Sequence, residues 1–129
     1  MRVFERSGKS GRGNRVTFVD ENNVVVGFEF EGSCCEVFGC VFVDKIPDNI
    51  SYDDNIESIE FKKEDYVFDT TFFNGNLSLK HCDCGACAFR LVNKTGGQIF
   101  LILYNRHDVY YAHGFDMKVN DKILYEGNI

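Results

Sequence analysis

The stretch Val24-Val25-Val26-Gly27-Phe28-Glu29-Phe30-Glu31 decides the fold class of this chain. Its even-numbered residues are all apolar, whereas its odd-numbered residues include a glycine and two glutamates. Successive side chains of a β-strand point to opposite sides, so this alternation predicts a strand with one buried and one wet face. Val16 and Phe18 alternate in the same way before a turn at residues 21–23, and the region is therefore a predicted β-hairpin.

Further β-type runs, separated by turn signals, follow along the chain. Predicted strands cover residues 37–43, 66–73, 77–80, 86–93, 98–105, 115–119 and 123–125. Residues 99–103 are apolar on both faces, which is typical of a strand in the middle of a sheet. The chain is predicted to be all-β or mainly β, an antiparallel sandwich or barrel-like meander of about eight to ten strands with at most short helices.

Length and composition indicate a single domain. A chain of 129 residues has the usual size of one domain, and 44% hydrophobic with 15% aromatic residues is too apolar for a disordered chain. No linker or repeat divides residues 1–129, so we expect one domain throughout. Residues 6–14 are rich in Gly, Ser, Lys and Arg and predict a flexible basic arm or loop.

Six cysteines form two groups, at positions 34, 35 and 40 and at positions 82, 84 and 87. The first ten residues carry charges where a secretory signal needs an apolar stretch, and no window approaches the roughly 18 apolar residues of a membrane helix. These features predict a soluble cytoplasmic protein without membrane contact. In a reducing compartment, clustered cysteines more often bind metal or carry redox chemistry than form disulfides.

The segment Cys82-Asp83-Cys84-Gly85-Ala86-Cys87 is the most specific local motif. Its C-x-C-x-x-C spacing can fold three thiolates around one point, and a structural zinc ion needs a fourth ligand to complete its tetrahedron. The pair Cys34-Cys35 ranks first as the source of that ligand, while Cys40 and His81 remain candidates. The sequence thus predicts a structural zinc ion whose ligands come from Cys82, Cys84, Cys87, Cys35 and Cys34.

Two other accounts of the cysteines stay open. Buried free cysteines pack as small hydrophobic residues, which is the interpretation we favour for Cys40 between Gly39 and Val41. Cys84 and Cys87 could instead serve a thiol-dependent or metal-dependent redox enzyme, although no helix follows them as in thioredoxin-like sites. No Ser-His-Asp order, phosphate-binding loop or paired-carboxylate motif supports an enzyme, so we expect a protein without catalytic or cofactor-binding residues.

The net charge of −6 is distributed unevenly. Residues 20–69 contain fourteen acidic and three basic side chains, whereas residues 1–19 carry a net +4 and residues 70–129 a net +1. Such an acidic surface repels phosphates, which disfavours direct nucleic-acid binding and favours a protein partner with a basic surface. Charge that only keeps the domain soluble is the alternative. The predicted partner-binding residues are Asp53, Asp54, Glu57, Glu60, Glu64 and Asp65.

Two segments resemble a known group of proteins. They are Gly32-Ser33-Cys34-Cys35-Glu36 and Leu103-Tyr104-Asn105-Arg106-His107-Asp108-Val109-Tyr110-Tyr111-Ala112-His113-Gly114-Phe115, which together look like a family of small uncharacterised phage and prophage proteins. That family has no established chemistry, and residues 82–87 are not part of its pattern. Small acidic proteins of this origin are similar to anti-CRISPR inhibitors, which implies binding to a basic channel or recognition lobe of a Cas nuclease.

The leading hypothesis combines these expectations. It is a non-enzymatic acidic phage or mobile-element protein that binds and inhibits a basic host nucleic-acid-handling protein, such as a Cas effector, in the bacterial cytoplasm. The zinc ion would serve the fold. The alternatives are the redox enzyme on residues 82–87 and a structural component that self-associates through exposed strand edges.

Overall fold

The computed structural model describes residues 1–6, 14–30, 38–47, 50–51, 58–75, 79–80, 85–105 and 114–129. These residues form eleven β-strands and one short 3₁₀ helix, η1 (Lys63–Asp65). The strands are β1 (Arg2–Arg6), β2 (Asn14–Val19), β3 (Val24–Phe30), β4 (Phe38–Val43), β5 (Ile50–Ser51), β6 (Tyr66–Asn74), β7 (Leu79–Lys80), β8 (Ala86–Asn93), β9 (Gln98–Asn105), β10 (Gly114–Val119) and β11 (Lys122–Asn128).

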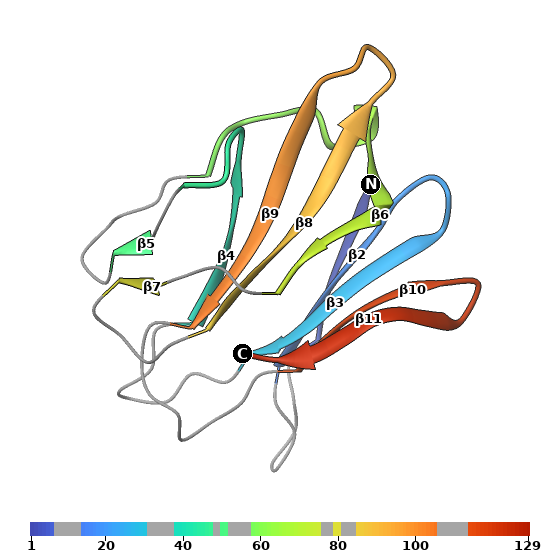
Figure 1. Cartoon of the computed structure of the whole chain (residues 1–129). Coiled ribbons are helices and arrows are strands. Elements are labelled where there is room, and N and C mark those ends of the chain that lie inside the picture. The colour runs from blue at the N-terminus through green and yellow to red at the C-terminus, as the bar shows by residue number, and fades with distance from the viewer. Residues whose placement is uncertain are drawn as a thin grey trace.

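The strands build a sandwich of two antiparallel sheets (Figure 1). One sheet has five strands in the order β1-β2-β3-β10-β11, and the other has four in the order β4-β9-β8-β6. The short parallel pair β5 and β7 lies apart from both sheets, near β4 in Figure 1. The predicted all-β class is confirmed, and of the two predicted architectures the sandwich is the one observed.

Turn chemistry explains where the hairpins fold. β10 and β11 are joined by Asn120 and Asp121, whose φ angles are 50° and 64°. Two consecutive residues with positive φ give the turn twist that matches the twist of paired strands, and Asn and Asp tolerate this conformation better than most residues. Gly96 takes a φ of 86° in the β8–β9 turn, where Asn93 Oδ1 also accepts hydrogen bonds from the N–H groups of Thr95 and Gly97.

The strand order requires pairings between distant segments. β3 pairs with β10 in the five-stranded sheet, and β4 pairs with β9 in the four-stranded sheet. The chain therefore crosses between sheets after β3 and crosses back after β9, so the strand order is not that of a meander. β9 lies between β4 and β8, which confirms the prediction of a central strand there.

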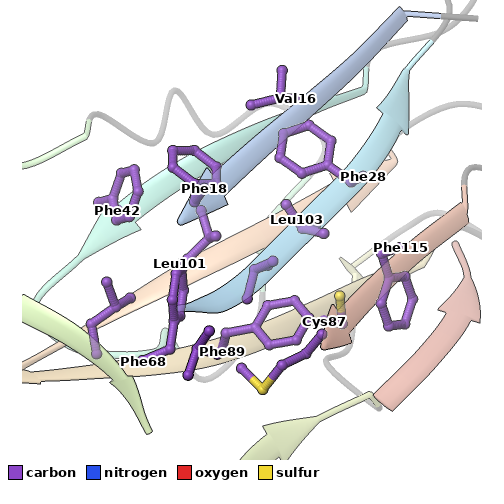
Figure 2. Packing of buried hydrophobic residues seen from close by; sticks show 14 of the residues in the cluster. Val16, Phe18, Phe28, Phe42, Phe68, Cys87, Phe89, Leu101, Leu103 and Phe115 are labelled. Atoms are coloured by element: carbon purple, nitrogen blue, oxygen red, sulfur yellow. The ribbon is translucent and has the colours of Figure 1, made fainter. Parts of the chain in front are cut away.

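The principal core fills the space between the two sheets (Figure 2). Phe89 of β8 lies edge-on to Phe115 of β10 with ring centroids 6.0 Å apart, and Phe73 of β6 packs 5.3 Å from Phe89 and 5.0 Å from Tyr125. Offset and edge-to-face contacts of this kind stabilise a core beyond simple burial of area. The inward residues of β2 and β3 are the ones that the alternation predicted, Val16, Phe18, Val24, Val26 and Phe28.

The four-stranded sheet is apolar on its outer face as well. A second buried cluster there consists of Val41, Val43, Ala86, Ala88, Phe100 and Ile102. The two faces of β8 therefore contribute to different clusters, with Ala86 and Ala88 outside and Cys87 and Phe89 inside. The sequence of a strand that is buried on both faces is a nearly continuous run of apolar residues.

A buried carboxylate ties the two sheets together. Asp20 ends the β2 side of the β2–β3 turn and is only 2% exposed. Its Oδ1 accepts the backbone N–H groups of Asn22 and Val24, both at 2.9 Å, and its Oδ2 accepts the N–H of Phe68 in β6 at 2.8 Å. A buried charge is tolerated when hydrogen bonds replace its hydration, and these three bonds do so.

The N-terminal part of the chain departs from the sequence-based expectation. β1 was not predicted, yet Arg2–Arg6 pairs with β2 over five consecutive residues. Residues 6 and 14 belong to strands, so only residues 7–13 of the predicted arm remain, and they lie outside the described part of the chain. A five-residue strand flanked by arginines offers too little alternation to be recognised without its partner strand.

Replacing Asp20 by Ala should lower the free energy of unfolding by about 2–4 kcal/mol, because two buried N–H groups and one partly buried N–H group lose their acceptor. Urea denaturation followed by fluorescence or circular dichroism measures this change. Glu21→Ala is the matched control, since Glu21 is exposed in the same turn, and it should shift the free energy by less than about 0.5 kcal/mol. Equal effects of the two substitutions would contradict the bridging role of Asp20.

Candidate functional site

The predicted zinc ligands fall mostly outside the described residues. Cys34, Cys35, Cys82 and Cys84 are not described, whereas Cys87 lies in β8. Within the described ranges, no three His, Cys, Asp or Glu side chains come together in an arrangement that could hold a metal ion. The zinc site therefore stays a prediction for the four undescribed cysteines.

Cys87 is a core residue. Its side chain is 0% exposed and belongs to the cluster between the sheets, among Phe89, Leu103 and Phe115 (Figure 2). Burial raises the pKa of this thiol to about 12, against a small opposing effect of a hydrogen bond with the backbone of Leu103. Zinc binds the thiolate, and a protonated thiol in apolar surroundings makes Cys87 a less favourable ligand than a solvent-exposed cysteine would be.

Cys40 lies on the inner face of β4, and it too is a free cysteine. Burial raises the pKa of its thiol, the Glu5 carboxylate adds to the increase, and Lys63 partly opposes it. Cys40 and Cys87 are both paired with Leu103, from opposite sides of β9. Two strand spacings, about 9.5 Å, separate them, which is beyond the reach of a disulfide.

The described residues that border the two cysteine groups lie close together. Phe38, which follows Cys34-Cys35 and residues 36–37, is paired with Asn105 in the β4–β9 ladder. Gly85, which follows Cys84, accepts the backbone N–H of Asn105 at 2.9 Å. The chain therefore leaves both cysteine-containing stretches at the same end of the four-stranded sheet.

The predicted acidic surface is described in part. Asp53, Asp54 and Glu57 lie outside the described residues, whereas Glu60, Glu64 and Asp65 are exposed in and before η1. Lys62 and Lys63 stand between them, so residues 60–65 carry a net charge of −1. The segment is thus less acidic than its count of carboxylates suggests.

The fold brings Glu64 to the β2–β3 turn, which carries Asp20 and Glu21. A depression of about 270 Å³ is lined by Met1, Arg2, Val19, Asp20, Glu21, Asn23 and Glu64. The N-terminal amine donates to the carbonyl of Lys63 at 3.3 Å and so holds η1 against the start of β1. Glu21 and Glu64 are 43 positions apart in the sequence, yet they line the same hollow. The lining contains the carboxylates of Asp20, Glu21 and Glu64 against the guanidinium of Arg2 and the N-terminal ammonium of Met1, which leaves a net charge of −1. We call this hollow the acidic depression.

A larger groove crosses the outer face of the five-stranded sheet. It has a volume of about 380 Å³ and is lined by Arg15, Glu29, Gly114, Phe115, Asp116, Glu126, Gly127 and Asn128. Arg15 donates from Nη2 to both carboxylate oxygens of Asp116, at 3.1 and 2.9 Å, and its Nη1 lies 3.9 Å from Glu29. Here one guanidinium stands among three carboxylates, those of Glu29, Asp116 and Glu126.

Gly27 allows Arg15 to lie flat across this groove. A Cβ atom on Gly27 would lie 2.4 Å from Nη2 of Arg15, so any side chain there would displace the guanidinium from Asp116. This site was not predicted from the sequence. The sequence did contain part of the pattern, since Arg15, Gly27 and Glu29 all occupy solvent-facing positions of the predicted hairpin. The residue that pairs with Arg15, Asp116, lies 101 positions away and could not be inferred from the hairpin.

Comparisons with known proteins give no relative for this chain. No family model matches it, and neither a curated protein nor a solved structure is significantly similar. Among the described residues, no helix has the length and apolar character needed to cross a membrane. The resemblance to phage proteins therefore remains a hypothesis based on the sequence alone.

Cys87 should resist alkylation by iodoacetamide in the native protein at neutral pH, because its thiol is buried and its pKa is raised to about 12. Raising the pH from 7 to about 9 should speed alkylation of an exposed thiol with a pKa of about 8.5 roughly 25-fold, because its thiolate fraction rises, while leaving Cys87 unmodified. Peptide mass spectrometry identifies the modified positions, and denatured protein provides the control in which Cys87 reacts. Fast modification of native Cys87 would mean that its position is not buried in solution.

Proposed function

We propose that the protein is a non-enzymatic binding domain that docks an acidic surface on a basic protein partner and thereby inhibits it. The single observation that supports this proposal best is the acidic depression, where Glu64, a predicted partner-binding residue, lies with Glu21. The resemblance to phage proteins suggests the class of partner, a host nucleic-acid-handling protein such as a Cas effector. Its positively charged channel for the guide–target duplex has the complementary sign.

Charge complementarity gives this interaction a recognisable salt dependence. The chain has a net charge of −6, and its exposed carboxylates at residues 21, 60, 64 and 65 gather near η1 and the β2–β3 turn. Opposite charges speed the encounter of two proteins, and salt screens this attraction over about 8–10 Å. Binding should therefore weaken steeply as ionic strength rises.

The double substitution Glu21→Gln with Glu64→Gln should weaken binding to a type II Cas nuclease about 5- to 30-fold at low salt, since each lost charge contact contributes about 0.5–1 kcal/mol. Biolayer interferometry with the immobilised nuclease measures the dissociation constant. The matched control is Glu29→Gln with Glu126→Gln, which makes the same change in net charge but in the groove of the five-stranded sheet.

The two double variants separate local contact from general attraction. Both have a net charge of −4 instead of −6, so long-range steering falls equally in both. A loss confined to the Glu21/Glu64 variant supports the acidic depression as the docking surface. Equal losses in both variants, or no binding of the unsubstituted protein at low salt, would sink the proposal.

A structural zinc ion remains part of the proposal. It rests on the two close cysteine pairs, Cys82 with Cys84 and Cys34 with Cys35, and on the common end of the four-stranded sheet at which the chain leaves both stretches, near Asn105. The ligands that fit best are Cys82 and Cys84 with the pair Cys34-Cys35, because four thiolates complete a closed tetrahedral site without the core thiol of Cys87. Such a site would cross-link two distant segments of the chain.

Purified untagged protein should contain about one zinc ion per chain by elemental analysis. Cys84→Ser should lose the zinc and lower the thermal unfolding midpoint, since metal binding that requires folding adds to stability. Cys40→Ala is the control and should keep the zinc, because Cys40 lies on the inner face of the sandwich. Protein that contains no zinc and has six titratable thiols would refute the metal site.

A further inference from the structure

The exposed strand edges of the two sheets are not equivalent. Beside β4, Ser58 Oγ accepts the N–H of Phe42 at 3.1 Å and Ile59 donates its N–H to the Phe42 carbonyl at 2.9 Å, so residues 58–59 cover part of this edge. In β6, residues 69–72 lie opposite Arg90 alone, which makes a wide bulge in that edge. Covered and bulged edges pair poorly with other strands.

The bulge of β6 is fixed by side chains. Asp69 accepts hydrogen bonds from the N–H and hydroxyl of Thr71, which hold the pKa of this carboxyl below its usual value, and it forms an ion pair with Arg90. The guanidinium of Arg90 also lies 4.7 Å from the ring centroid of Phe72. These contacts keep the edge of the four-stranded sheet out of register with any added strand.

The five-stranded sheet has one bulged and one regular edge. β11 bulges at Leu124, because Met117 is paired with Tyr125 while the next residue, Lys118, is paired with Ile123. β1 instead keeps an unbroken register with β2 over five residues, and β2 is its only partner among the described strands. β1 also exposes two large apolar side chains, Val3 at 38% and Phe4 at 52%. A regular edge with exposed apolar residues is a template for a further strand.

The side chains of β1 alternate between the two faces of the sheet. Val3 is paired with the buried Phe18 and so points toward the inner face, whereas Phe4 is paired with Thr17 and points outward. Arg2 lies on the same outward face, with its guanidinium 5.8 Å from the Phe4 ring centroid. Any strand added to this edge must match an inner apolar position and an outer arginine–aromatic pair.

A second copy of β1 satisfies both requirements. In a two-fold antiparallel pair with Val3 opposite Val3, Arg2 of each copy stands opposite Phe4 of the other on the outer face. This repeats between chains the cation–π contact already present within the chain. Centring the pair on Phe4 would instead place Arg2 opposite Arg6 and Val3 opposite Glu5, which are unfavourable pairs.

We propose that the protein self-associates into a two-fold dimer through an antiparallel β1–β1 contact centred on Val3, which joins two five-stranded sheets into one continuous sheet. The contact uses main-chain hydrogen bonds along the strand and a small apolar area. A contact of this size gives a weak, concentration-dependent dimer. The inference does not depend on the proposed partner, because a dimer can form with or without one.

Sedimentation equilibrium of the untagged full chain tests the dimer. The average mass should rise from 14.8 kDa toward twice that value as the concentration increases, over a range of about 1 µM to 1 mM. Val3→Lys and Val3→Glu should each remain monomeric, because each places two like charges opposite one another. An equimolar mixture of the two variants should regain the dimer, since only a heterodimer pairs opposite charges at position 3.

Recovery of the dimer in the mixture of Val3→Lys and Val3→Glu distinguishes loss of the β1–β1 contact from a general effect on folding. Ile123→Lys and Ile123→Glu are the matched controls, because Ile123 is 50% exposed on the opposite edge of the same sheet, and they should associate like the unsubstituted protein. Thermal unfolding of all four variants verifies that they fold. A monomeric unsubstituted protein at the highest concentration, or a Val3→Lys variant that still dimerises, would overturn the proposal. A mixture that stays monomeric would overturn the register centred on Val3.

Discussion

The carboxylate of Asp20 joins the two sheets by hydrogen bonds at the edge of the apolar core that packs between them. It accepts two N–H groups within its own turn and one from Phe68 in the opposite sheet. A buried carboxylate must keep all such donors, since a lost bond leaves an unsatisfied charge in an apolar interior. The same contact sets the start of β6 beside the β2–β3 turn. Because η1 directly precedes β6, Glu64 comes to lie next to Glu21. The acidic depression is therefore a consequence of how the sandwich is closed.

Burial of β8 on both faces limits what the cysteines can do. Cys87 points into the core with Phe89, while Ala86 and Ala88 pack on the outer face. A thiol whose pKa is raised to about 12 is neither a good nucleophile nor a good metal ligand. A reactive or metal-bound thiolate would then have to come from Cys82 and Cys84, which precede Gly85, or from Cys34 and Cys35, which precede Phe38. This division explains how one cysteine-rich motif can contribute one residue to the core and offer the others for a different purpose.

Charge and strand edges suggest two interaction surfaces, which meet at Arg2. The acidic depression lies at η1 and the β2–β3 turn and suits a basic partner. The β1 edge instead offers main-chain groups and the side chains of Val3 and Phe4. Attraction at the first surface is screened by salt, whereas apolar contact at the second is not. The groove above Gly27 has a larger excess of carboxylates than the depression, and its guanidinium is already engaged in two hydrogen bonds with Asp116.

Local sequence determined the strands and turns of this protein, because side-chain alternation and turn-forming residues act over a few positions. The inward residues of β2 and β3, the central position of β9 and the turn at Asn120 all follow from such patterns. Tertiary structure alone decided the pairing of β3 with β10 and of β4 with β9, the strand β1, and the contact of Arg15 with Asp116. It also decided that Cys87 is a core residue, since the direction of a side chain depends on which strands lie on either side of it. Contacts between residues about one hundred positions apart leave no periodic signal, because each is fixed by the packing of the whole chain.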